Sequence, residues 1–250
     1  MLHDALQTGG YAVMPSLVSQ AECASYDAAL EREWRRVGEP ALFSQEDVHI
    51  EEGMHVSPVG LACGGILQRI PALADFLLRP ALLAFFERVL GEGFELELGS
   101  GVVSDASRGF LTWHHHAGGI DEPDLRRKEY PHGSRVERIG CTLYTAPLGG
   151  DLGTLLVHPR PVDSPTQPPF EPGREPWPGA QELHAPAGSV VFLDQGTWHA
   201  VSPKRGPGHR HFFAFFVRRA GLAQTKRRDE SIAHAFAERK ELARAYGGAR

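Results

Sequence analysis

The chain has 250 residues, of which 42% are hydrophobic and 23% carry a charge, and its formal net charge at pH 7 is −5. This balance is typical of a soluble globular protein with a sizeable core, and the lack of a basic excess argues against a nucleic acid as partner. No apolar stretch approaches the length of a membrane span, and residues 1–10 lack the pattern of a signal peptide, so we also expect no membrane partner.

The first predicted elements are a short strand and two helical segments. The segment Gly9–Pro15 indicates a turn followed by a strand that ends at a proline. Ser19, with Glu22 three residues later, has the capping-box pattern that begins a helix. Pro71–Leu90 has a strong helical pattern that is broken or restarted at Pro80.

After Gly91 the pattern changes to short apolar runs between loops rich in glycine and proline, which predicts strands. The predicted strands are Phe94–Leu98, Val102–Ser104, Phe110–His116, Arg138–Thr145, Thr154–Val157, Ser189–Leu193 and His211–Val217. The Pro-rich stretch Pro159–Gly179 has no hydrophobic period, and we expect an excursion over the surface or a lid. Asp229–Tyr246 has the pattern of a charged amphipathic helix.

The order of these elements, helices first and then a long β half, predicts one domain that is mainly β with flanking α-helices. We expect a double-stranded β-helix, which is a jelly-roll or cupin-like barrel. Residues 1–93 would form a helical N-terminal buttress, residues 94–220 the β core and residues 221–250 a C-terminal helix.

The cysteines bear on the environment of the protein. The chain has 3 cysteines, Cys23, Cys63 and Cys141, which lie far apart and form no CxxC pair. An odd number at such spacing argues against a disulfide framework or a zinc knuckle, and favours a cytoplasmic location.

Three consecutive histidines, His114, His115 and His116, follow Trp113 in a predicted strand. Side chains at positions i and i+2 of a strand point to the same face. His114 and His116 would therefore share one face, and His115 would point to the other. Two imidazoles on one face are half of a plausible metal site, although a polar strand edge would look the same.

A second candidate segment ends at His199. A turn at Pro186–Gly188 leads into an apolar strand and a tight turn, which places His199 at the rim of a barrel. Eleven residues later, Arg210 begins another apolar strand. A buried arginine is costly unless it meets an anion, and the guanidinium fork suits a carboxylate, either of a ligand or of an internal salt bridge.

These segments together resemble the phytanoyl-CoA dioxygenase-like branch of the Fe(II)/2-oxoglutarate oxygenases. The resemblance covers most of the chain, from the opening GGYAVMPSLVSQAECASYDAAL through RPALLAFFERVLG to AGSVVFLDQGTWHAVSP. Its most specific part is the pair of eleven-residue steps from Gly188 to His199 and from His199 to Arg210. The resemblance implies that His199 binds iron and that Arg210 pairs with the distal carboxylate of 2-oxoglutarate.

The sequence departs from the family at the proximal motif. The family has W-H-x-D, which completes a facial triad of two histidines and one carboxylate. Aligned on Trp113, this chain has His114 and then His116 in place of the aspartate. The family's PGSH-like segment is also absent, since Val157–Arg160 reads VHPR.

Three interpretations of the missing carboxylate are open. His116 replaces the aspartate, so that His114, His116 and His199 form a three-histidine site with one more unit of positive charge, suited to an anionic ligand. Alternatively His115 is the ligand and Ala117 leaves an open position, as in the iron halogenases. In the third interpretation a nearby acid such as Asp121 completes the site, or the site is degenerate. Trp113 favours the first.

Three further residues are candidates for contact with the co-substrate. Thr142 and Tyr144 lie on one face of a predicted strand, where either side chain can hydrogen-bond a bound 2-oxo acid. Ser202 lies three residues after His199, where related sequences often have a small polar residue. An ordinary solvent-facing strand residue would show the same pattern.

The resemblance implies an enzyme that oxidises, and in most cases hydroxylates, a small organic substrate with O2, Fe(II) and 2-oxoglutarate. Two other classes remain open: a three-histidine iron dioxygenase or lyase that does not use 2-oxoglutarate, and an inactive barrel that serves as a binding module. The sequence does not identify the substrate. We expect the loops at 37–68, 117–135 and 159–179 to shape its pocket.

Overall fold

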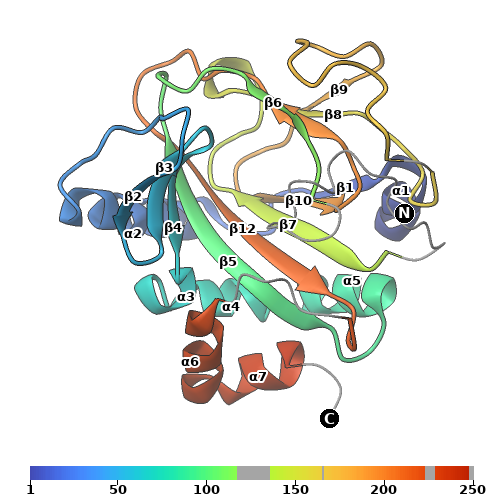
Figure 1. The fold of residues 1–250 in the computed structure, drawn as a ribbon. Helices are drawn as coiled ribbons and strands as arrows, with labels where there is room; N and C mark the ends of the chain where they lie inside the picture. The colour runs from blue at the N-terminus through green and yellow to red at the C-terminus, as the bar shows by residue number, and fades with distance from the viewer. Residues whose placement is uncertain (117–135, 165, 223–228, 248–250) are drawn as a thin grey trace.

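Two antiparallel β-sheets face each other in the computed structural model, which describes residues 1–116, 136–164, 166–222 and 229–247 (Figure 1). The larger sheet has the spatial order β1 (Tyr11–Met14), β10 (Ser189–Asp194), β7 (Arg138–Tyr144), β12 (Arg210–Arg218), β5 (Glu95–Ser104), β4 (Gly60–Gly64), β3 (Met54–Ser57) and β2 (Val48–Glu51). The smaller sheet has the order β6 (Leu111–His114), β11 (His199–Val201), β8 (Leu155–Val157) and β9 (Gln181–Leu183). This mainly β architecture with flanking helices confirms the predicted double-stranded β-helix.

Helices lie against the face of the large sheet that points away from the small sheet (Figure 1). They are α1 (Leu2–Gly9), α2 (Gln20–Arg36), α3 (Ile66–Arg69), α4 (Leu73–Leu77), α5 (Pro80–Leu90), α6 (Glu230–Glu238) and α7 (Lys240–Tyr246). The predicted capping box is present at α2, where Ser19 and Glu22 satisfy each other's backbone N–H groups. Pro80 is the first residue of α5, so the proline separates two helices as expected.

Several elements differ from the sequence prediction. The predicted C-terminal helix Asp229–Tyr246 is two helices that meet at Arg239, where the backbone leaves the helical conformation. Within residues 1–93, α1 was not anticipated, and the ambiguous stretch 37–68 contributes β2, β3 and β4 to the large sheet. The N-terminal part of the chain therefore supplies strands as well as helices. The short strands β9 and β11 were not anticipated either.

Strand β5 is continuous across residues for which the sequence predicts a break. Gly99 and Gly101 interrupt the apolar pattern, which is why two separate strands were expected there. A side chain at Gly101 would meet Leu30 of α2 at 2.9 Å and Ile66 of α3 at 3.0 Å. The glycines therefore mark a place where α2 and α3 approach the backbone of β5 closely.

The alternation along β12 divides the interior of the protein into two regions. Four residues, Arg210, Phe212, Ala214 and Phe216, line a cavity between the sheets. The intervening apolar residues, Phe213, Phe215 and Val217, belong to the core under the helices. Since the two faces alternate strictly, the position of one side chain in this strand fixes the direction of the others.

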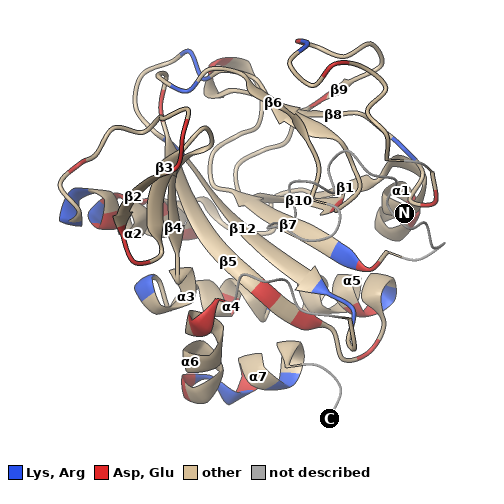
Figure 2. Ribbon diagram, viewed as in Figure 1, with Lys and Arg blue, Asp and Glu red and all other residues tan. Residues whose placement is uncertain are grey.

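Charged residues gather at one end of β5, β7 and β12 (Figure 2). Glu97 lies 3.3 Å from Arg138 and 3.5 Å from Arg218, and Arg218 also pairs with Glu95. Because the carboxylate of Glu97 is only 4% exposed, these shared contacts satisfy a charge that would otherwise be buried at high cost. The pairing holds the three central strands together away from the cavity.

The Pro-rich stretch 159–179 packs on the back of the small sheet instead of closing the cavity. Trp177 stacks on Trp113 with ring centroids 4.5 Å apart and lies 5.3 Å from Trp198. None of the described residues between 159 and 179 lines the cavity. The expectation that this stretch shapes the pocket was therefore wrong, because its apolar side chains complete a separate core.

We predict that Trp177→Ala destabilises the fold by about 3–5 kcal/mol, because Trp177 is only 1% exposed and its removal leaves a large cavity beside Trp113. Urea unfolding of the variant and the parent protein measures this difference. A loss below about 1 kcal/mol would show that the stretch contributes little to the stability of the small sheet.

No helix in the described part of the chain combines the length and the apolar character needed to cross a membrane.

Candidate metal centre

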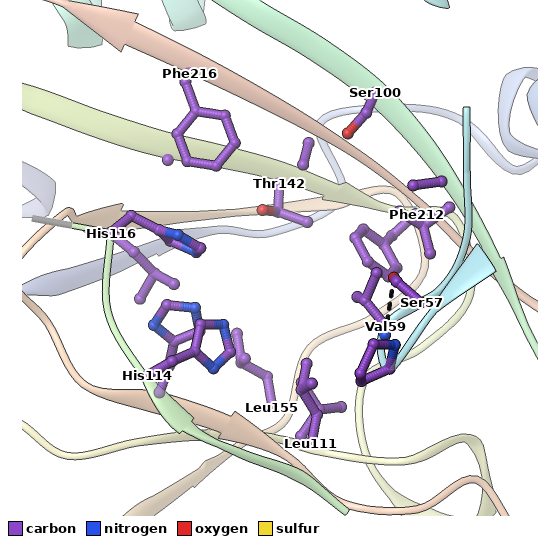
Figure 3. Close-up of a pocket in the computed structure, with 18 of the residues that line it drawn as sticks. Ser57, Val59, Ser100, Leu111, His114, His116, Thr142, Leu155, Phe212 and Phe216 are labelled. Atoms are coloured by element: carbon purple, nitrogen blue, oxygen red, sulfur yellow. Dashed lines mark hydrogen bonds between the residues drawn. The ribbon is translucent and has the colours of Figure 1, made fainter. Parts of the chain in front are cut away.

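Three histidines, two in strands of the small sheet and one just after β6, come together in the cavity. His199 of β11 is the direct partner of His114 of β6 in the antiparallel register, so both side chains lie on the same face. His116 follows two residues after His114 and points to that face too. One nitrogen of each ring lies within 4.8 Å of the others, and the ring centroids of His114 and His199 are 4.2 Å apart. Figure 3 shows His114 and His116 directed into the cavity, opposite Phe216 and Thr142.

Hydrogen bonds to the backbone fix which nitrogen of two of these rings is protonated. His114 donates from Nδ1 to the carbonyl of Thr112 at 2.8 Å, and His199 donates from Nδ1 to the carbonyl of Thr197 at 2.9 Å. A carbonyl only accepts, so Nδ1 carries the proton and Nε2 keeps its lone pair. This is the arrangement that orients histidine toward a metal. The donor set therefore fits a divalent transition-metal ion.

The third histidine is positioned by its backbone. The N–H of His116 donates to the carbonyl of Gln195 at 2.8 Å, which ties the end of β6 to the turn before β11. The same turn is fixed to the end of α1, because the carbonyl of Gly10 accepts from the hydroxyl of Thr197 at 2.9 Å. Gly10 is in the left-handed conformation, and a side chain there would meet that hydroxyl at 2.2 Å. The turn thus holds two of the three histidines.

One of the alternative ligands, His115, is not part of this cluster. His115 is fully buried on the opposite face, where its ring lies edge-on to Trp198 at 4.6 Å. The sequence-based alternation correctly separated it from His114 and His116. Asp121, with Ala117, lies outside the described residues. Ser202 does not line the cavity; its carbonyl accepts a hydrogen bond from Arg108.

The cavity has a volume of about 610 Å³ and is lined by both sheets. The other end, away from His114 and His116, is formed by Ser57, Val59 and Phe212 (Figure 3). Ser57 accepts a hydrogen bond from the N–H of Val59 at 3.3 Å, which shapes the turn between β3 and β4. The expectation that residues 37–68 contribute to the pocket is confirmed by these residues. The volume suits a small organic molecule together with a co-substrate.

Arg210 is the cation that faces this cavity from the large sheet. It is 4% exposed, and its Nη2 atom has no hydrogen-bond partner among the described residues. Its guanidinium lies over the ring of Tyr144 at 5.3 Å and over the ring of Phe212 at 5.8 Å. Burial lowers the pKa of Arg210. Thr142 and Tyr144 line the same cavity, as predicted from their alternation in the strand.

A second buried arginine, Arg108, was missed in the sequence. It is 2% exposed, lines the cavity, and donates to the carbonyls of Val201 at 3.4 Å and Ser202 at 2.8 Å. Burial and the neighbouring charge of Arg210 lower its pKa to about 10. The one signal in the sequence is its position just before a predicted apolar strand, and that position does not indicate the hydrogen bonds to Val201 and Ser202 that bring Arg108 to the cavity.

The acids that line the cavity do not neutralise these two arginines. Among the described residues they are Asp47 and Asp194. Asp194 is engaged by Arg160, whose Nη1 lies 3.0 Å from its Oδ2. The charges that affect the pKa of Arg108 are those of Arg210 and Tyr144, and the charge that affects the pKa of Arg210 is that of Tyr144, so no acid contributes to either. The cavity therefore presents excess positive charge to an anion.

The buried carboxyl of Asp194, which precedes the turn before His199, should make the stability of the fold depend on pH. Burial raises the pKa of this carboxyl to about 6, although Arg160 opposes the rise. The pKa of Asp194 is higher in the folded protein than in the unfolded chain. The free energy of unfolding is therefore fully retained below about pH 4 and decreases as the pH rises through about 6. We predict that Asp194→Asn removes this pH dependence. Between those pH values the free energy of unfolding of the variant should therefore rise relative to that of the parent protein by at most about 3 kcal/mol. Urea unfolding at several pH values measures the difference, and a constant difference would contradict the prediction.

No family model matches the chain, and no curated protein matches its sequence. Solved structures do match. HygX from Streptomyces hygroscopicus, solved with nickel, 2-oxoglutarate and hygromycin B bound, is 17% identical with a TM-score of 0.63, over 90% of this chain and 89% of HygX. The α-ketoglutarate-dependent carbocyclase SnoK of nogalamycin biosynthesis is 17% identical with a TM-score of 0.62, over 88% and 83%. The epimerase SnoN is 16% identical with a TM-score of 0.59, over 89% and 86%.

The chain thus has the fold of these non-haem enzymes, a double-stranded β-helix. At identities this low the likeness establishes the fold alone, and it supports the resemblance to the phytanoyl-CoA dioxygenase-like family at that level. Any functional conclusion therefore depends on the residues of the cavity.

Proposed function

We propose that the protein is a non-haem iron enzyme that oxidises a small organic substrate with O2 and 2-oxoglutarate. One observation carries this proposal: His114, His116 and His199 line the same cavity as the buried Arg210. The fold gives independent support, because HygX was crystallised with nickel and 2-oxoglutarate, and separately with iron.

In this proposal the three histidines hold Fe(II) through one nitrogen each, and the protonated Nδ1 atoms of His114 and His199 keep their rings in place. Bound iron would supply activation of O2 coupled to the oxidative decarboxylation of 2-oxoglutarate to succinate. The ring of Phe216 lies 5.4 Å from that of His116, centroid to centroid, so an apolar side chain borders the histidines and would help to keep bulk water from the reacting groups.

Arg210 fixes the distal carboxylate of 2-oxoglutarate in this arrangement. Its buried Nη2 needs an acceptor, and a carboxylate satisfies a guanidinium with two parallel hydrogen bonds. Thr142 and Tyr144, which line the same side of the cavity, supply hydroxyl groups for the bound anion.

The three-histidine ligand set has an electrostatic consequence. Three neutral imidazoles leave a divalent ion with its full charge, whereas a carboxylate ligand would cancel one unit. Together with Arg108 and Arg210, this favours anionic ligands in the cavity. We therefore propose that the substrate or the co-substrate contributes the negative charge that the protein does not. We propose that the enzyme hydroxylates a C–H bond of the substrate.

The test is to load the protein anaerobically with Fe(II), add 2-oxoglutarate and O2, and measure O2 consumption and succinate. Formation of succinate that depends on His199 supports the proposal. O2 consumption without succinate would instead identify a three-histidine dioxygenase that uses no 2-oxoglutarate. Failure to retain any metal would indicate a barrel that only binds ligands. Screening small alcohols, sugars and carboxylic acids for stimulated succinate release then identifies the substrate class.

A further inference from the structure

A second group of metal-ligating side chains lies on the other side of β12 from the cavity. Glu31 of α2, His209 and His211 each place one donor atom within 4.8 Å of the other two. His211 faces the helices because it alternates with Arg210, which faces the cavity. The cluster therefore lies directly behind the arginine that the proposed co-substrate site uses.

The donor atoms converge on one carboxylate oxygen. Oε1 of Glu31 lies 2.5 Å from Nδ1 of His209 and 2.8 Å from Nε2 of His211. The side chains are 15%, 20% and 10% exposed in the order Glu31, His209 and His211, so the cluster is mostly shielded but reachable from solvent. Two imidazoles and one carboxylate are a donor set that zinc-type ions prefer.

A neighbouring carboxylate lies behind the most buried ligand. Oδ1 of Asp27 lies 3.5 Å from Nδ1 of His211, on the side of the ring opposite the nitrogen that faces Glu31. A carboxylate behind a histidine is the usual outer contact of a metal-bound imidazole. Asp27 and Glu31 are four residues apart on α2, so one helix face supplies both acids. His209 is held on its other side by Trp34, with ring centroids 4.6 Å apart.

The charge of the cluster also suits a cation. Asp27 and Glu31 contribute two negative charges, and Arg35, which is 60% exposed, lies 3.5 Å from the other oxygen of Glu31. Neutral histidines leave a net negative site. A tetrahedral ion with bonds of about 2.0–2.1 Å needs its donors roughly 3.3 Å apart, so the hydrogen-bonded side chains have to separate by less than about 1 Å.

We infer that Glu31, His209 and His211 form a second metal site for a zinc-type divalent ion, with Asp27 as the outer carboxylate. The ion ties α2 to the residues on both sides of Arg210. The inference does not depend on the proposed function, because the ligands are separate from the cavity histidines.

Metal stoichiometry tests the inference. The full chain is stripped with a chelator at pH 8, loaded with Zn²⁺, desalted and analysed for bound zinc. We expect about two equivalents in the parent protein, and about one in Glu31→Gln/His209→Gln and in His114→Ala/His199→Ala. The combined variant should bind none. His234→Gln is the matched control, because it removes a histidine that also pairs with a glutamate, Glu238 at 3.1 Å, but whose side chain is 53% exposed and belongs to no three-donor group among the described residues.

The outcomes separate the two sites. If Glu31→Gln/His209→Gln binds as much zinc as the parent protein, the second site is wrong whatever the cavity does. If the parent protein binds one equivalent that only Glu31→Gln/His209→Gln removes, the second site holds and the cavity site fails. A second measurement requires no substitution at the cluster. In His114→Ala/His199→Ala, Zn²⁺ should slow the acylation of His209 by diethyl pyrocarbonate about 10-fold, and mass spectrometry measures the acylation. Unchanged acylation would overturn the inference.

Discussion

Replacing His199 with alanine should abolish stoichiometric iron binding at the cavity site and lower the turnover rate at least about 10³-fold. His199 is the link between the two halves of the site, because it lies on β11 and pairs with His114 on β6. Its loss leaves two donors from a single short segment of the chain, too few to hold Fe(II) against water. Bound iron and succinate formation measure the effect. His184→Ala is the control, since the side chain of His184 is 66% exposed and outside the cavity.

The same assay distinguishes the interpretations of the missing carboxylate. If His116 is the third ligand, His116→Ala loses iron, whereas His116→Asp keeps it and restores the family's two-histidine, one-carboxylate set. His115→Ala should retain iron and lose only stability, because the ring packs against Trp198 on the other face. Full iron retention in His116→Ala would contradict the three-histidine site and favour an open ligand position.

Much of this site followed from alternation along single strands. The period of two correctly placed His114 and His116 on one face and His115 on the other. The same period of two places His211 on the opposite face of β12 from Arg210. Such predictions succeed because a strand's pleat is a local property that tertiary contacts do not change.

What alternation leaves undetermined is which strands are neighbours. The pairing of His114 with His199 joins residues 85 positions apart, and it depends on the register of β6 against β11. β11 has only 3 residues, too few for a hydrophobic pattern to indicate a strand. The family resemblance supplied this connection, and the sequence pattern did not.

Contacts made by loops were the least predictable. Arg108 precedes β6 and reaches the cavity through hydrogen bonds to the end of β11. Ser57 and Val59 reach it because β2, β3 and β4 extend the large sheet. In both cases the position depends on hydrogen bonds to a segment that is distant in the chain, and composition carries no information about those contacts.

Replacing Arg210 with methionine should weaken 2-oxoglutarate binding about 100-fold, which corresponds to the roughly 3 kcal/mol of a buried, charge-assisted pair of hydrogen bonds. The fold should tolerate the change, since the substitution removes a buried cation whose Nη2 has no hydrogen-bond partner among the described residues. The affinity of Arg210→Lys for 2-oxoglutarate should lie between those of the parent protein and Arg210→Met, because a lysine keeps the charge and loses the two-pronged geometry. Titration of the iron-loaded protein with 2-oxoglutarate in the absence of O2 gives the dissociation constants.

A 2-oxo acid without the second carboxylate provides the decisive comparison. 2-Oxovalerate keeps the group proposed to bind the metal, and it should bind the parent protein and Arg210→Met equally well. The difference between the two ligands then isolates the contact of Arg210 with the distal carboxylate. Arg108→Met should weaken 2-oxoglutarate less, because the hydrogen bonds of Arg108 go to backbone carbonyls. If Arg210→Met instead left 2-oxoglutarate binding unchanged and raised the KM of an acidic substrate, Arg210 would hold the substrate, as in an iron dioxygenase that uses no 2-oxoglutarate.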